Sequence, residues 1–170
     1  ADGHHRYEAA LNYRNYCREN GISKPGDPQD FQMIYLVDME HPGLVVFPTH
    51  RLVRDLPNFD KEAVLEKCSE FFYIDEKEGT DTMEEDLKKL YDEGKKAFGF
   101  YCGKGEWFLL TLKNIDFMSQ MLPNVSKASQ SLDVSVLHTL ILEKIFGIDK
   151  ENMAKQINLT YTKFFTEAID

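Results

Sequence analysis

Hydrophobic residues recur at helical spacing in several parts of the chain, and these parts are predicted to be α-helices. The first predicted helix covers about residues 3–20, and Gly21 is placed to end it because glycine commonly follows the last helical turn. A second helix is predicted after Asp60, a candidate N-cap, and a third after Thr82, which has Glu85 three residues on in the capping-box pattern. Further helices are predicted over residues 115–121, 132–146, 150–156 and 162–170, with Pro123 ending the first of these and Gly147 the second.

Short apolar runs between glycine, proline and polar clusters are predicted to be β-strands. Residues 31–39 (FQMIYLVDM) and 44–47 form one predicted β-hairpin, with Pro42 second and Gly43 third in a type II turn. Residues 97–102 and 107–112 form another, which turns at residues 103–106. Shorter strands are predicted at 72–74 and 157–161, while the acidic stretch 75–81 and the polar stretch 126–130 are predicted to be loops.

These elements predict an α+β fold, in which an antiparallel or mixed sheet with β-hairpins packs against several helices. The 170 residues, 42% of them hydrophobic, suit a single domain over 1–170 with a core of its own. No apolar run approaches the roughly 20 residues of a membrane span, and no signal peptide is visible, so a cytoplasmic protein is expected. The three cysteines form no CxxC pair and are interpreted as reduced, buried thiols: Cys17, Cys68 and Cys102.

The formal net charge of −9 at pH 7 narrows the classes of partner. A protein that binds nucleic acid usually presents a basic face, and none is evident in the sequence. The acidic balance therefore disfavours DNA or RNA, and no membrane partner is expected. It does not disfavour a small phosphorylated ligand or nucleotide that a few local cations hold.

The start of the first predicted helix carries the strongest candidate site. Helix N-termini have unpaired N–H groups and a partial positive charge, so they bind anions. Gly3 allows close approach of a ligand to the backbone, and His4, His5 and Arg6 add donors and charge. Asp2 would fit as an N-cap or as a partner of magnesium. The alternative is an ordinary helix start, capped by Asp2, with no ligand.

A second candidate group follows the predicted strand 44–47. Pro48 cannot donate to a ladder, so pairing is expected to stop there and to leave His50 and Arg51 presented at a strand end. The two side chains would add positive charge to the same phosphate site. The alternative is that Arg51 pairs with a surface carboxylate and His50 is only a polar edge residue.

Other residues with chemical potential have structural interpretations that we prefer. Trp107 and its phenylalanine neighbours could stack on a base but are expected to be sheet core. His138 is expected to be a satisfied core histidine rather than a ligand. A zinc site from His4, His5 and His50 is disfavoured, because adjacent helical residues diverge by roughly 100°. Phosphate-loop, dinucleotide-fold, HExxH and GxSxG motifs are absent from the sequence.

Three segments together carry a resemblance to a known family. They are residues 1–14 (ADGHHRYEAALNYR), 42–53 (PGLVVFPTHRLV) and 132–138 (LDVSVLH). In this order they resemble a bacterial and archaeal family known only as a domain of unknown function, number ten-fifteen. The family more remotely resembles the ParB/sulfiredoxin-like superfamily, whose G-x-x-R motif contacts nucleotide phosphates and which includes an ADP-dependent free serine kinase. Gly3 and Arg6 stand at the two fixed positions of that motif.

The resemblance implies an incomplete ParB/sulfiredoxin-like core with a C-terminal extension, in a C-terminal fragment excised from a longer protein. It implies a nucleotide, ATP or ADP with Mg²⁺, and in the longer protein a small-molecule, amino-acid-type phosphotransferase whose catalytic base lies upstream. The fragment alone is then expected to be inactive. A non-catalytic nucleotide-binding regulatory module of ParB-like type is the alternative, and a polar motif that only stabilises the fold is a third interpretation.

Overall fold

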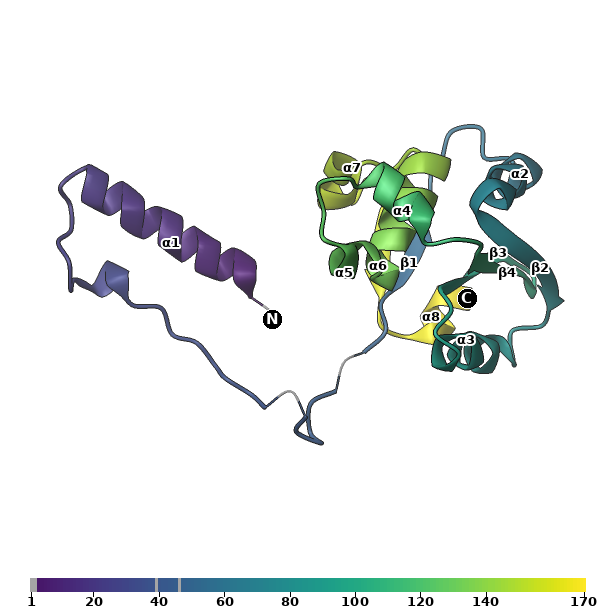
Figure 1. Ribbon diagram of the computed structural model, residues 1–170, viewed down its shortest axis with the longest axis horizontal. Helices are drawn as coiled ribbons and strands as arrows, with labels where there is room; N and C mark the ends of the chain where they lie inside the picture. The colour runs from purple at the N-terminus through teal and green to yellow at the C-terminus, as the bar shows by residue number, and fades with distance from the viewer. Residues whose placement is uncertain (1–2, 39, 46) are drawn as a thin grey trace. The chain divides into compact units, whose positions relative to one another are not determined.

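The structure, a computed structural model, describes residues 3–38, 40–45 and 47–170 (Figure 1). The chain divides into two compact units, Ala1–Val46 and Phe47–Asp170. The second unit contains two antiparallel sheets and most of the helices, which confirms the predicted α+β class.

The first unit is built around the predicted first helix, α1 (His4–Glu19). The helix ends as predicted at Gly21, whose φ of 68° lies in the left-handed region that glycine adopts without strain. The N–H of Gly21 bonds the carbonyl of Arg18, and the N–H of Ile22 bonds the carbonyl of Cys17 at 2.8 Å, which is the Schellman pattern. A short 3-10 helix, η1 (Pro28–Asp30), follows and is tied back by the ion pair of Arg18 with Asp30 at 2.7 Å.

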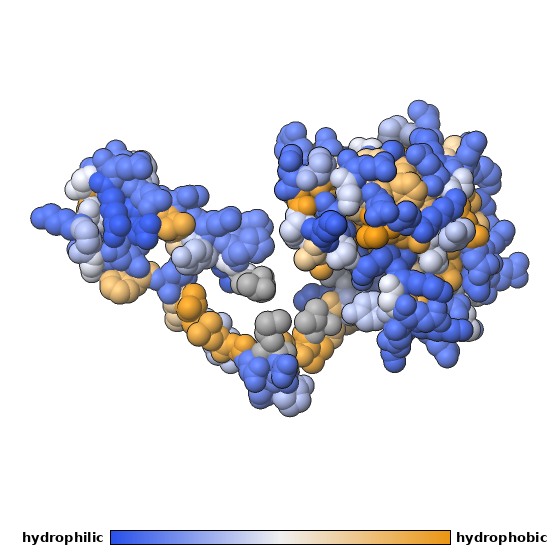
Figure 2. All heavy atoms as spheres, viewed as in Figure 1, coloured by the Kyte–Doolittle hydropathy of each residue, from blue (hydrophilic) through white to orange (hydrophobic). Residues whose placement is uncertain are grey.

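The predicted β-hairpin over residues 31–47 is wrong. Within 31–38, 40–45 and Phe47 the backbone forms no ladder, and Met39 and Val46 lie outside the described residues. The large apolar side chains described in this segment are exposed, with Met33 at 93% and Tyr35 at 90%, and Figure 2 shows hydrophobic residues along the extended part of the first unit. The turn itself forms, with Leu44 N–H bonded to His41 carbonyl at 2.8 Å, but Gly43 lacks the positive φ of a type II turn. β-Propensity alone makes no strand, because a strand also needs a partner for its backbone groups.

A three-stranded antiparallel sheet forms the centre of the second unit, with strand order β2-β4-β3. Strands β3 (Ala97–Gly103) and β4 (Glu106–Leu112) are the predicted hairpin, and Lys104 and Gly105 turn between them with positive φ, as a two-residue type I′ turn requires. Strand β2 (Phe72–Glu78) is longer than predicted. Its acidic half, expected to be a loop, pairs with β4 as far as Glu78 opposite Glu106.

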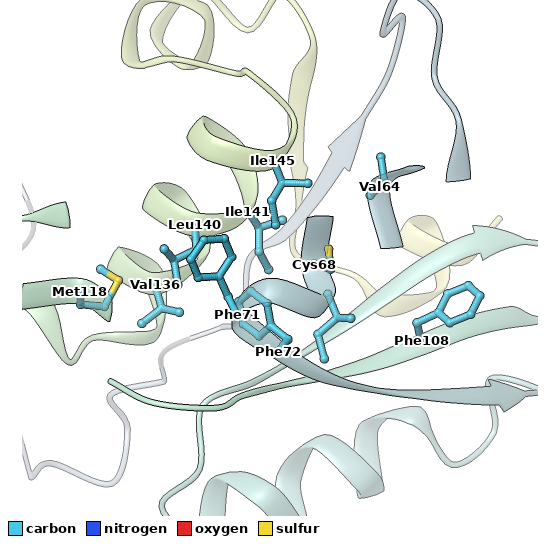
Figure 3. Packing of buried hydrophobic residues seen from close by; sticks show 11 residues of the cluster. Val64, Cys68, Phe71, Phe72, Phe108, Met118, Val136, Leu140, Ile141 and Ile145 are labelled. Carbon is cyan, nitrogen blue, oxygen red and sulfur yellow. The ribbon is translucent and has the colours of Figure 1, made fainter. Parts of the chain in front are cut away.

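Alternation along β4 places apolar side chains on both faces of this sheet. Trp107 and Leu109 pack with Met83 against α3 (Met83–Asp92). Phe108 and Leu110 face the larger core, which receives side chains from α2 (Lys61–Phe71) and from the helix that begins at Asp133. Figure 3 shows residues of this core gathered between the sheet and the two helices; those labelled are Val64, Cys68, Phe71, Phe72, Phe108, Met118, Val136, Leu140, Ile141 and Ile145.

The predicted helix 132–146 is one continuous helix with two kinds of hydrogen bonding. Its first turn is α6 (Asp133–Val136), and its remainder is η2 (Leu137–Ile145), a π-helix in which the wider turn bonds residue i to residue i−5. Phe146 N–H continues this pattern to the carbonyl of Ile141 at 3.0 Å. Gly147, with φ of 72°, ends the helix as predicted.

A second sheet has only two strands, β1 (His50–Val53) and β5 (Leu159–Thr162), which pair antiparallel. The prediction that His50 and Arg51 follow a strand end is therefore wrong, because the strand begins at His50 rather than ending before it. Pro48 precedes the ladder, where its missing N–H costs no hydrogen bond. Residues 157–161 were correctly predicted to contain a strand.

Short helices complete the second unit. They are α4 (Asp116–Met121), α5 (Lys127–Gln130), α7 (Lys150–Lys155) and α8 (Phe165–Ile169). Three of them agree with the predicted pattern. The exception is α5, which was predicted to be loop and forms because the Ser126 side chain accepts a hydrogen bond from Ser129 N–H at 3.2 Å, an N-cap.

The three cysteines are free thiols, as predicted. Cys17 and Cys68 are buried and Cys102 is half-buried. Burial raises the pKa of the Cys68 thiol to about 11, so this sulfur stays protonated and unreactive near neutral pH.

Candidate functional site

The N-terminus of α1 carries the predicted helix-terminal site. Gly3, with φ of 79°, occupies the N-cap position, and its carbonyl accepts hydrogen bonds from Arg6 N–H at 3.0 Å and Tyr7 N–H at 3.1 Å. His4, His5 and Arg6 are exposed, and the first turn contains no acidic residue. Asp2 lies outside the described residues. The positive end of a helix and these donors are accessible to an anion from solvent.

The two histidines of this turn lie together rather than diverging. Their ring centroids are 4.0 Å apart at an interplanar angle of 42°. His5 Nδ1 also lies 3.7 Å from Glu8 Oε2, and both side chains are largely exposed, so this pair adds little stability.

His50 and Arg51 are neighbours on β1 and point to opposite faces of the two-stranded sheet, as successive strand residues do. His50 is opposite Thr162, and its ring meets Phe165 of α8 edge-on at 5.9 Å. Arg51 is opposite Tyr161, and its guanidinium carbon lies 5.9 Å from the centre of the Tyr161 ring. The two side chains are therefore presented to different surroundings.

Arg51 is half-buried and has no carboxylate within ion-pair distance in the described part of the chain. One terminal nitrogen donates to the carbonyl of Thr49, and buried Nε has no hydrogen-bond partner among the described residues. Burial lowers the pKa of Arg51, although the guanidinium remains charged at neutral pH. A partly buried charge without a counter-ion is unfavourable, and an anionic ligand would compensate it.

The sequence did not reveal the surroundings of His138. This half-buried residue lies on η2, and its buried Nε2 has no hydrogen-bond partner among the described residues, unlike the satisfied core histidine expected. Burial, and then the positive charge of Arg51, lower the pKa of His138. The third segment of the family resemblance, which ends at His138, was the signal that could have marked it.

Trp107 is core, as predicted, and does not form a stacking platform. Its side chain is 0% exposed, and its indole N–H donates to the carbonyl of Gly79 at 2.8 Å. A buried indole with its donor satisfied is a structural residue.

The predicted site residues thus divide between the units. Gly3, His4, His5 and Arg6 belong to the first, and His50 and Arg51 to the second. Their joint action on one ligand stays a prediction.

Metal ligands and membrane spans were also sought among residues 3–38, 40–45 and 47–170. No three His, Cys, Asp or Glu side chains there are grouped closely enough to hold a metal ion. None of the helices in these ranges has the length and apolar character needed to cross a membrane.

Comparison with known proteins identifies a family. Neither the curated proteins nor the solved structures include a match to this chain. A family model described as a protein of unknown function (DUF1015) matches residues 1–135, which contain the first two resemblance segments and the beginning of the third. Because this match covers well over half of the sequence, the chain belongs to the DUF1015 family of proteins of unknown function.

Proposed function

We propose that this protein binds a phosphorylated small molecule of the nucleotide class, such as ATP or ADP with Mg²⁺. In the second unit Arg51 is the proposed phosphate ligand, and in the first unit the N-terminal turn of α1, Gly3 to Arg6, is a separate anion-binding candidate. His50 belongs to the same predicted set.

The observation that carries the proposal is the uncompensated charge of Arg51. Its guanidinium is half-buried, its Nε has no described partner, and no described carboxylate pairs with it. Exposed arginines avoid this cost by staying in water, as Arg54 does three residues later. A planar guanidinium with unused donors matches the oxygens of phosphate in shape and charge.

The turn at His4 supports the same ligand class. A helix of 16 residues presents its N–H groups and dipole there, with two imidazoles and a guanidinium and no acidic side chain in the first turn. These features neutralise phosphate oxygens, which is the main contribution of protein groups to phosphoryl transfer. Together with the remote superfamily resemblance, they favour an amino-acid-type phosphotransferase.

The proposal is tested by thermal shift of this chain with ATP, ADP, CTP, GTP and inorganic phosphate, each with and without Mg²⁺. A ligand that prefers the folded state raises Tm. We expect at least one nucleotide to raise Tm and Arg51→Ala to reduce or abolish that rise, while Arg6→Ala tests the N-terminal turn of α1 separately.

Matched control variants distinguish the loss of a phosphate ligand from the loss of one positive charge elsewhere on the protein. Arg54→Ala removes an exposed arginine near Arg51, and Arg14→Ala removes a second arginine of α1 two turns beyond Arg6. Both should keep the nucleotide-dependent rise. Absence of any rise with the unchanged protein, or a rise that survives Arg51→Ala and Arg6→Ala together, would refute the proposal.

A further inference from the structure

The second unit contains a surface pocket whose lining includes His138 but none of the proposed phosphate ligands. It has a volume of about 250 Å³ and lies between the helix Asp133–Ile145, α7 and the chain after α4. Leu122 and Met153 are among its apolar lining residues. Pockets for drug-sized ligands are usually about 300–1,000 Å³, so this pocket suits a smaller molecule.

Polar side chains line the helix side of the pocket. They come from one face of an otherwise buried helix and are Ser135, His138, Thr139 and Glu143. The opposite side of the same helix supplies core residues such as Leu140 and Ile141. The packing of the core therefore fixes the direction in which these polar groups point.

Two opposite charges line the pocket without neutralising each other. Glu143 is half-buried on η2, and Lys150 is exposed at the first residue of α7. Neither takes part in an ion pair with any described residue, whereas Glu151 and Lys155 on α7 pair with each other at 2.6 Å. The pocket thus offers a negatively charged side chain, Glu143, to a cationic group and a positively charged side chain, Lys150, to an anionic group.

His138 adds a third polar group, which can make a further hydrogen bond. Its Nε2 is buried without a described partner, and it lies on the π-helical part of the helix. π-Helical turns are rare and occur frequently at functional sites, because the wider turn displaces side chains from their regular α-helical positions.

We infer that this pocket binds a small zwitterion, a molecule that carries one carboxylate and one ammonium group. Lys150 faces the carboxylate, Glu143 faces the ammonium group, and His138 hydrogen-bonds to a polar substituent. Apolar neighbours such as Met153 contact the carbon skeleton. This site shares no residue with the proposed phosphate ligands, so either proposal can fail without the other.

The test uses this chain and a mixture of the twenty free amino acids as probes, with saturation-transfer NMR to detect binding and titration to measure Kd. We expect a subset to bind, and Glu143→Gln and Lys150→Gln each to weaken binding about tenfold or more, since each removes a charge-assisted hydrogen bond. Glu151→Gln and Lys155→Gln are charge-matched controls outside the pocket and should leave Kd unchanged.

Singly charged probes test the ligand class. Glycolate carries only the carboxylate and ethanolamine only the ammonium group, so both should bind at least about tenfold more weakly than the best amino acid. The inference is overturned if no amino acid binds, if either single-charge probe binds equally well, or if the control variants weaken binding as much as the pocket variants.

Discussion

At the scale of the residue, burial decides the chemistry of His138. Neutral imidazole tolerates a half-buried position, whereas imidazolium loses hydration there and is also repelled by Arg51 on β1. In the unfolded chain the same side chain returns to a pKa near 6.5. The folded protein therefore binds fewer protons at this site than the unfolded chain as pH falls below that value.

This difference predicts a pH dependence of stability. Because the pKa of His138 is lowered by folding, its favourable contribution is complete above about pH 6.5 and is lost as pH falls through the folded pKa. In NMR titrations His138 should have a midpoint below 6.5. Urea unfolding should show that the unchanged protein loses more stability between pH 7.5 and 5.5 than His138→Gln does. Equal losses in the two proteins, with a normal midpoint for His138, would refute this interpretation.

At the scale of the element, two helix starts that look alike in sequence differ in structure. Asp60 caps α2, because its side chain accepts a hydrogen bond from Ala63 N–H at 3.1 Å. Thr82 stands at the N-cap of α3 as the capping-box pattern predicts, but its side chain makes no capping bond and lies 3.4 Å from Asp86 instead. The sequence pattern marks where the helix begins without ensuring that the cap forms.

The two caps therefore predict unequal effects of the same substitution. Asp60→Ala should lower the free energy of unfolding by about 1 kcal/mol, because Ala63 N–H loses its partner. Thr82→Ala should change it by less than about 0.5 kcal/mol, as surface substitutions usually do. Urea unfolding measures both. A loss at Thr82 equal to that at Asp60 would show that the capping box does form in solution.

At the scale of the whole molecule, the buried apolar clusters belong to the second unit. The sheet β2-β4-β3, α2, α3 and the helix from Asp133 make two of them, and η2, α7 and β5 make the third. In the described part of the first unit Cys17 is the only buried apolar side chain, whereas large apolar side chains within 31–38 and 40–45, such as Met33 and Tyr35, are exposed. Hydrophobic burial is the main favourable term in folding, so the two units differ in their sources of stability.

This distribution predicts that residues 47–170 fold without the first unit. The shortened chain should unfold cooperatively with the same urea midpoint as the whole chain, because the clusters are all retained. Far-UV circular dichroism in urea measures it. A shortened chain that is unfolded in buffer, or that has a clearly lower midpoint, would show that the first unit stabilises the second.

Predictions from the local sequence were confirmed where neighbouring residues alone determine the backbone conformation. Gly21 ends α1 and Gly147 ends the helix from Asp133 because their positive φ costs little, and Gly105 helps close the β3–β4 hairpin for the same reason. The apolar run from Phe31 failed as a strand prediction, because a ladder depends on a partner that periodicity cannot supply. Strand β2 was predicted too short, since pairing with β4 outweighs the polarity of its acidic end.

The sequence by itself determined the helix ends, the tight hairpin, the α+β class and the residues with chemical potential, because these depend on backbone sterics, side-chain periodicity and residue type. Only the tertiary structure decided what surrounds those residues. Among the described residues Arg51 has no counter-ion and lies opposite Tyr161, and His138 Nε2 has no hydrogen-bond partner there, while the Arg51 charge lowers the pKa of His138. Burial and electrostatic environment arise from contacts between residues far apart in the chain, and local patterns do not contain them.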